Sequence, residues 1–225
     1  MTLRFPMALA ALAAACLLAQ PAQAAHRACG WSGYSYAGFE AAAAAYGVSA
    51  RITVLSQASV ESGHVAAWIG FGGDGLGPGG ADEWVQAGIA SFPDGRSELY
   101  YEYRAPGRRA PVYASLGVVG PGESHTVAVV ERPAQPNTWR VWVDGMPMSP
   151  SIDLPASHGA WQPVATAESW DGGTPSCNRF AFDFDTLSVA SSFRGAWRPF
   201  LLSSPIQAPG YRLRPRATAF TASAA

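Results

Sequence analysis

The sequence predicts an all-β protein whose strands form a sandwich or jelly roll of antiparallel sheets. Glycine (24 residues) and proline (18 residues) interrupt the chain at short intervals. Between these breaks, apolar and polar residues alternate with the period of a strand, and helical periodicity is scarce. The 225 residues suit one domain with a sizeable core.

Each expected strand is a short alternating segment bounded by turn residues. These segments are residues 47–54, 64–73, 82–90, 97–105, 124–132, 138–145, 161–170 and 178–190. An Asp-Gly pair ends the segment at 138–145 and indicates a tight turn. The alanine-rich residues 39–46 are expected to form a helical turn or two.

The chain ends are expected to differ from this central domain. Arg4, an apolar run at 7–19 and an Ala22-Gln23-Ala24 site predict a signal peptide over residues 1–24, cleaved after Ala24, and hence a secreted or periplasmic protein. A lipid anchor on Cys16 is the alternative. Residues 25–200 then form the β-sandwich domain. Residues 201–225 form an edge strand, with alternate arginines on one face, or a partly disordered tail.

Charge and cysteine content limit the classes of partner. A net charge of −1 gives no electrostatic footprint for nucleic acid, and no segment is apolar over a membrane-spanning length. We expect a monomer that needs no cofactor or metal. The glycine-rich loop at 72–80 has no phosphate-loop lysine, and calcium at Asp74, Asp82 and Glu83 is the weaker alternative. Cys29 and Cys177 form a disulfide in an exported protein or remain separate thiols.

Sorting the strands by parity gathers polar and aromatic residues on one sheet face. They are Trp68, Trp84, Gln86, Glu98, Tyr100, Glu102, Arg104, Glu168 and Trp170. Large aromatics with a few carboxylates and an amide are typical of a groove that holds an extended polymer, a peptide or a polysaccharide. The alternative is an ordinary outer face on which Glu102 pairs with Arg104 or Arg51.

Six short blocks, taken in order, carry a resemblance to a known family. They are WSGY (31–34), GVSARITV (47–54), AAWIGFGG (66–73), WVQAGI (84–89), YYEY (100–103) and ATAESW (165–170). Their order and spacing resemble the eqolisins, secreted glutamic peptidases that act in acid. The resemblance implies a concanavalin A-like jelly-roll sandwich of two antiparallel sheets, one with a concave cleft face.

The resemblance also implies site residues. Gln86 matches the glutamine of the family's catalytic pair, Trp68 matches the cleft tryptophan, and Glu98, Tyr100 and Glu102 match positions that line the cleft. The family's catalytic glutamate ends a block of the form A-E-W-I-V-E. In an ungapped match it falls on Gly172, and Glu168 matches the first glutamate of the block.

Three functions remain open. In a peptidase, Glu168 would be the general base, the Gln86 amide would stabilise the oxyanion, and Glu102 would influence the ionisation of Glu168. In a glycoside hydrolase, Glu102 and Glu168 would form the pair of carboxylates. A chain that has lost its base would be a module that binds carbohydrate or peptide.

Overall fold

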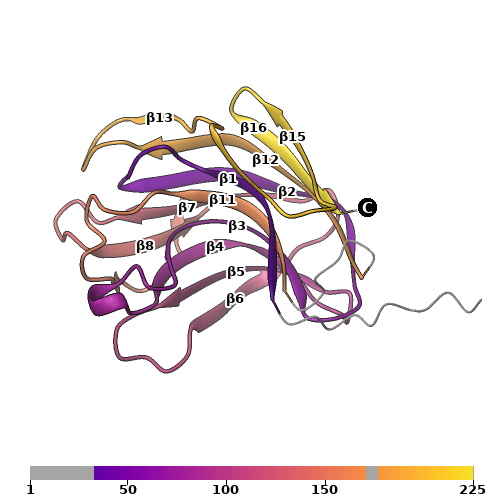
Figure 1. The fold of residues 1–225 in the computed structure, drawn as a ribbon, viewed down its shortest axis with the longest axis horizontal. Helices are drawn as coiled ribbons and strands as arrows, with labels where there is room; N and C mark the ends of the chain where they lie inside the picture. The colour runs from indigo at the N-terminus through magenta and orange to yellow at the C-terminus, as the bar shows by residue number, and fades with distance from the viewer. Residues whose placement is uncertain (1–32, 171–176, 225) are drawn as a thin grey trace, which may run out of the picture.

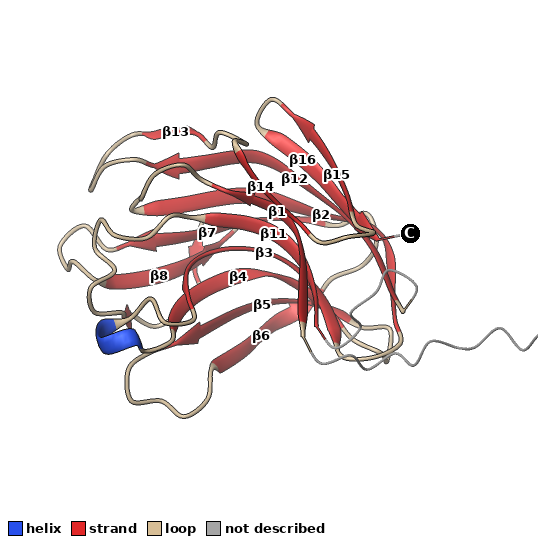
Figure 2. Ribbon diagram, in the orientation of Figure 1, coloured by secondary structure: helices blue, strands red, loops and turns tan. Residues whose placement is uncertain are grey.

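A computed structural model describes residues 33–170 and 177–224. Two curved antiparallel sheets pack face to face, as a β-sandwich of the predicted class (Figure 1). The ribbon consists of strands and loops apart from a single 3₁₀ turn, η1 (Pro78–Gly80), in the glycine-rich loop (Figure 2). None of the described helical segments is long and apolar enough to cross a membrane.

The first sheet has seven strands, and its order is seen in Figure 1 from β1 at the top to β6 at the bottom. From one edge to the other they are β14 (Ser204–Gln207), β1 (Tyr34–Glu40), β11 (Val164–Trp170), β3 (His64–Gly73), β4 (Glu83–Ser91), β5 (Ser97–Arg104) and β6 (Val112–Val118). Strands distant in sequence, β11 and β3, lie beside each other at its centre.

The second sheet has nine strands. Its main path is β10 (Ile152–Asp153), β8 (Thr138–Val143), β7 (Ser124–Glu131), β2 (Gly47–Val60), β12 (Asn178–Ala190), β16 (Ala219–Ala224) and β15 (Arg212–Arg216). Strand β9 (Met146–Pro147) pairs with β8, and β13 (Trp197–Pro199) pairs with β12. Asp144 and Gly145 both have positive φ in the turn from β8 to β9, as the Asp-Gly signal predicts.

The core lies between the sheets and follows from the two-residue period of the strands. In β4, Val85, Ala87 and Ile89 are fully buried against the second sheet. Phe182 and Phe184 of β12 are fully buried in the same cluster. Because this face is filled by packing, the opposite face of the seven-stranded sheet remains available for a site.

One sequence expectation differs from the structure. Residues 41–46 form bends and loops instead of a helical turn, because their apolar side chains pack onto the sandwich, where Ala41 and Ala45 are buried. Near the end of the described chain, β16 pairs with β12 on one side and with β15 on the other, and Phe220 is fully buried. The three-arginine segment forms β15 at the edge of the second sheet.

Candidate active site

Strand register determines which side chains meet on the concave face. Glu168 of β11 lies opposite Ala66 of β3, and Gln86 of β4 lies opposite Gly70 of β3 and Glu102 of β5. These residues share one face of the sheet. Residues paired across neighbouring strands point to the same side, and Ala66 and Gly70 are four positions apart on β3. Small residues at positions 66 and 70 leave space above β3 for the longer side chains on either side.

Glu168 is held by two donors from a single strand. The Trp68 indole Nε1 donates to Oε2 at 2.9 Å, and His64 Nε2 lies 3.1 Å from Oε1. His64 and Trp68 flank Ala66, which is the residue directly opposite Glu168, so each reaches one carboxyl oxygen diagonally. The Glu168 side chain is only 6% exposed. Its orientation is therefore fixed before any ligand binds.

Gln86 is fixed by its neighbours on β5. Its Nε2 donates to Tyr100 Oη at 3.2 Å and to Glu102 Oε2 at 3.1 Å. Gln86, Glu102 and Glu168 all line one cleft of about 390 Å³, together with Trp68. The two residues expected to be catalytic, Gln86 and Glu168, thus face the same space.

The surroundings of the Glu102 carboxyl alter its acidity. Burial raises its pKa above the usual carboxyl range, and the nearby Glu168 carboxylate raises it further. His64 and the hydrogen bond from Gln86 oppose this rise in the pKa of Glu102. Neither arginine considered from the sequence pairs with it, since Arg51 binds Asp185 and Arg104 approaches Asp82 at 3.6 Å. Glu102 therefore remains protonated to a higher pH than an exposed glutamate does.

Two tyrosines of β1 complete one wall of the cleft. Tyr36 lies opposite Glu168 in the register and meets the Trp68 ring edge-on, with the centroids 6.5 Å apart. Tyr34 stacks on Tyr36 at 5.9 Å. Burial and the Glu168 charge raise the pKa of Tyr36, so its hydroxyl is neutral at any ordinary pH. Sequence parity missed both tyrosines because residues 34–40 were not recognised as a strand.

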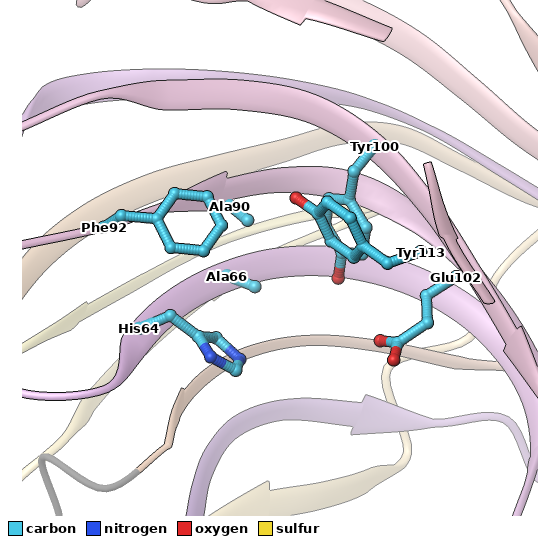
Figure 3. Close-up of a pocket in the computed structure, with 7 residues that line it drawn as sticks. All are labelled: His64, Ala66, Ala90, Phe92, Tyr100, Glu102 and Tyr113. Atoms are coloured by element: carbon cyan, nitrogen blue, oxygen red, sulfur yellow. The ribbon is translucent and has the colours of Figure 1, made fainter. Parts of the chain in front are cut away.

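A smaller cavity of about 170 Å³ opens beside this cleft and shares His64 and Glu102 with it. Figure 3 shows Ala66 and Ala90 between His64 and Phe92 on one side and Tyr113, stacked on Tyr100, on the other. The alanines leave room, and the rings form apolar walls. The cavity is thus shaped for an apolar side chain. The aromatic lining from Phe92 and Tyr113 was not foreseen, since residue 92 follows a strand and β6 was not predicted.

The remaining predicted groove residues occupy different places. Trp84 and Arg104 line the larger cleft, where the guanidinium lies over the indole at 5.7 Å. Tyr100 is buried beneath the smaller cavity. Glu98 lines neither cavity and instead accepts hydrogen bonds from β6. Trp170 also lines neither; it is 37% exposed and stacks on His64.

Some sequence predictions involve residues beyond the described part of the chain. The signal peptide, Cys29 and Gly172 all lie there. Cys177 is buried, and its pairing with Cys29 stays a prediction. Among residues 33–170 and 177–224, no group of three or more His, Cys, Asp or Glu side chains is arranged to hold a metal ion. Asp82 instead accepts a hydrogen bond from the Gly75 amide in the glycine-rich loop.

Comparison with known proteins identifies similar structures. No protein-family model matches the chain, and no curated protein matches it. Scytalido-glutamic peptidase with a peptide-based transition state analog is 19% identical, with a TM-score of 0.58, over 87% of this chain and 99% of that one. SCP-B, a member of the eqolisin family of peptidases, in complex with the tripeptide Ala-Ile-His, is 18% identical, with a TM-score of 0.55 over the same shares.

The extent of these matches bears on the fold. Each covers 99% of the solved peptidase, so the resemblance includes both sheets rather than a local motif. The low identity restricts the conclusion to architecture. The chain has the jelly-roll β-sandwich fold seen in the eqolisin glutamic peptidases.

Proposed function

We propose that the concave cleft is the active site of an exported glutamic-type endopeptidase that acts on extended peptides. Glu168 is the general base, and the amide of Gln86 stabilises the oxyanion. The observation that carries this proposal is the paired support of Glu168, with one donor on each oxygen, in the same cleft as Gln86. A base in a fixed orientation and a neutral donor that line the same cleft are the two groups that hydrolysis of an amide requires.

The proposed reaction has two proton transfers. Glu168 takes a proton from a water molecule while the oxygen of that water forms a bond with the scissile carbonyl carbon. The negative charge that develops on the carbonyl oxygen is stabilised by the N–H groups of Gln86. The protonated Glu168 then gives its proton to the amide nitrogen, and the C–N bond breaks to leave an amine and a carboxylic acid.

The Gln86 amide can stabilise an oxyanion only if one of its N–H groups is free to bind it. Both of the hydrogen bonds that its Nε2 donates go to protein acceptors, Tyr100 Oη and the Glu102 carboxyl. An oxyanion must replace one of them. When Glu102 is protonated it is the weaker acceptor, so replacing it costs less. The raised pKa of Glu102 therefore supports activity on the acidic side of neutrality.

The similar structures are consistent with a peptide as the occupant. The two glutamic peptidases matched over 87% of this chain carry, respectively, a peptide-based transition state analog and the tripeptide Ala-Ile-His. In this chain, the cleft walls are tyrosine and tryptophan rings, which provide contact area for an extended ligand. The smaller cavity beside the cleft offers an apolar position for one side chain of such a ligand.

The direct test is cleavage of an unbiased peptide library between pH 3 and pH 7 by the mature protein. We expect cleavage products with new amino and carboxyl termini, and none from Glu168→Gln, whose folding is checked by thermal unfolding. If the wild-type protein cleaves no peptide but binds library members, the cleft belongs to a binding module instead. Glu98→Gln, which alters a carboxylate outside both cavities, is the matched control and should retain activity.

The pair of carboxylates supports a second candidate, a glycoside hydrolase. Burial, and then the charge of Glu168, raises the pKa of Glu102, which is the direction of shift that suits the general acid of glycoside hydrolysis. Glu102 would donate a proton to the leaving oxygen, and Glu168 would act as base or nucleophile. Release of reducing sugar from a polysaccharide panel, abolished by both Glu102→Gln and Glu168→Gln, would favour this function over the peptidase.

A further inference from the structure

We infer that His64 is a positioning residue for Glu168, which fixes the orientation of the carboxylate as general base. The inference rests on the proposed function, because it assigns a supporting residue to the same base. It derives from a two-sided contact, in which His64 lies 3.1 Å from one Glu168 oxygen while Trp68 binds the other.

The position of His64 in the strand gives it this contact. His64 begins β3 and lies opposite Trp170, so Glu168 is its diagonal neighbour on β11. Ala66, between His64 and Trp68 on the same face, has no side chain long enough to separate them from the carboxylate. A residue in that place with a larger side chain would block the contact. The pattern His-x-Ala-x-Trp over residues 64–68 therefore encodes a two-sided support for a carboxylate from the next strand.

The imidazole is itself held in place. Its ring stacks on Trp170, with centroids 5.5 Å apart and an interplanar angle of 26°. Phe92 lies on another side, with its centroid 6.3 Å away. The His64 side chain remains 27% exposed and lines both cavities. Its orientation toward Glu168 is therefore maintained at the edge of the space that a ligand would occupy.

This contact has a defined consequence for a general base. Glu168 must present an oxygen to the attacking water, and a carboxylate held by Trp68 alone could still rotate away from it. The contact of His64 with the other oxygen restricts that rotation. A neutral side-chain donor of similar length should therefore be able to replace His64, and substitution can test this.

Kinetics of two variants test this role. His64→Ala removes the contact, and we expect kcat to fall about 10- to 100-fold, because small displacements of a catalytic group have effects of this size. His64→Gln keeps a neutral donor, so it should recover most of the lost rate, a rescue that a merely structural role of the ring would not produce. His125→Ala, which breaks a His–Asp pair on the other sheet, should leave kcat unchanged.

A measurement independent of activity separates failure of this inference from failure of the proposed function. In NMR spectra of the full mature chain at a single pH, the ring nitrogen signals of His64 should change position in Glu168→Gln relative to the wild type, because their hydrogen-bond partner changes, whereas those of His125 should not. Unchanged His64 signals, or a His64→Ala variant with the wild-type rate, would overturn the inference. A wild type that cleaves no peptide but shows the His64 shift would contradict the peptidase proposal alone.

Discussion

Strand β4 has a different kind of order on each of its two faces. Toward the second sheet, Val85, Ala87 and Ile89 are fully buried and make only apolar contacts with that sheet. Toward the cleft, Gln86 is held by hydrogen bonds and still lines an open cavity. The inward face gains its stability from packing alone. On the outward face the polar groups satisfy one another, and they retain the capacity to bind a ligand instead.

The largest expected effect tests this division by substituting residues on opposite faces of the same strand. Ile89→Ala should lower the free energy of unfolding by about 2–5 kcal/mol, because it opens a cavity in the core. Gln86→Ala should lower it by less, about 0.5–1.5 kcal/mol for each of the two hydrogen bonds that it removes. Urea denaturation at pH 6 measures both. If Gln86→Ala and Ile89→Ala lost equal stability, the cleft face would contribute as much to the free energy of unfolding as the buried core does.

Glu83 is the exception on the inward face and provides the second prediction. It is fully buried, and neither carboxyl oxygen has a hydrogen-bond partner among the described residues. Burial raises its pKa, and nearby Asp153 adds to the rise. A raised pKa in the folded state means that Glu83 favours folding most at low pH, and that this stability is lost as pH rises through the folded-state value.

Replacement of Glu83 by glutamine should therefore stabilise the protein only where the carboxyl would ionise. We expect an increase of about 1–3 kcal/mol at pH 7, the usual cost of a buried group without a partner, and little change at pH 3. Thermal unfolding at the two pH values measures this. The control is the half-buried Glu98, whose oxygens do have hydrogen-bond partners, so Glu98→Gln should give no gain in stability at pH 7. A variant that is destabilised equally at both pH values would show that Glu83 has a favourable partner.

Glu102 gives a smaller effect, confined to the outward face. Its raised pKa keeps it protonated on the acidic side of neutrality, and ionisation at higher pH strengthens its hold on Gln86. Glu102→Gln removes that charge, so activity should persist to higher pH. On the alkaline side, kcat/KM at a given pH should rise about tenfold for each pH unit by which the alkaline limb moves. A kcat/KM profile from pH 3 to pH 8 measures the limb. An unchanged profile would exclude Glu102 as the group that restrains Gln86.

The sequence predicted the sandwich and the concave face because strand parity is visible wherever alternation is regular. Trp68, Gln86, Glu102 and Glu168 share a face through that period alone. The parity argument missed β6, which alternates but has no fully buried residue, and β1, which lacks alternation because aromatic residues precede an alanine run. Consequently Tyr36 and Tyr113 were missed.

His64 was missed for a different reason. It lies on a predicted strand and on the correct face, but its role depends on which strand becomes the neighbour of β3. The pairing of β3 with β11 joins residues about a hundred positions apart, and no local pattern specifies it. Register between distant strands is a property of the folded sheet.

The central claim is that Gln86 and Glu168 act together on a peptide. Single-turnover cleavage of a peptide from the library, by Gln86→Ala, Glu168→Gln and the double variant, tests it most directly. Each single substitution should slow cleavage by about 100-fold or more, and the double variant should be no slower than the more impaired single variant. Cleavage by folded Gln86→Ala at the wild-type rate would contradict the account.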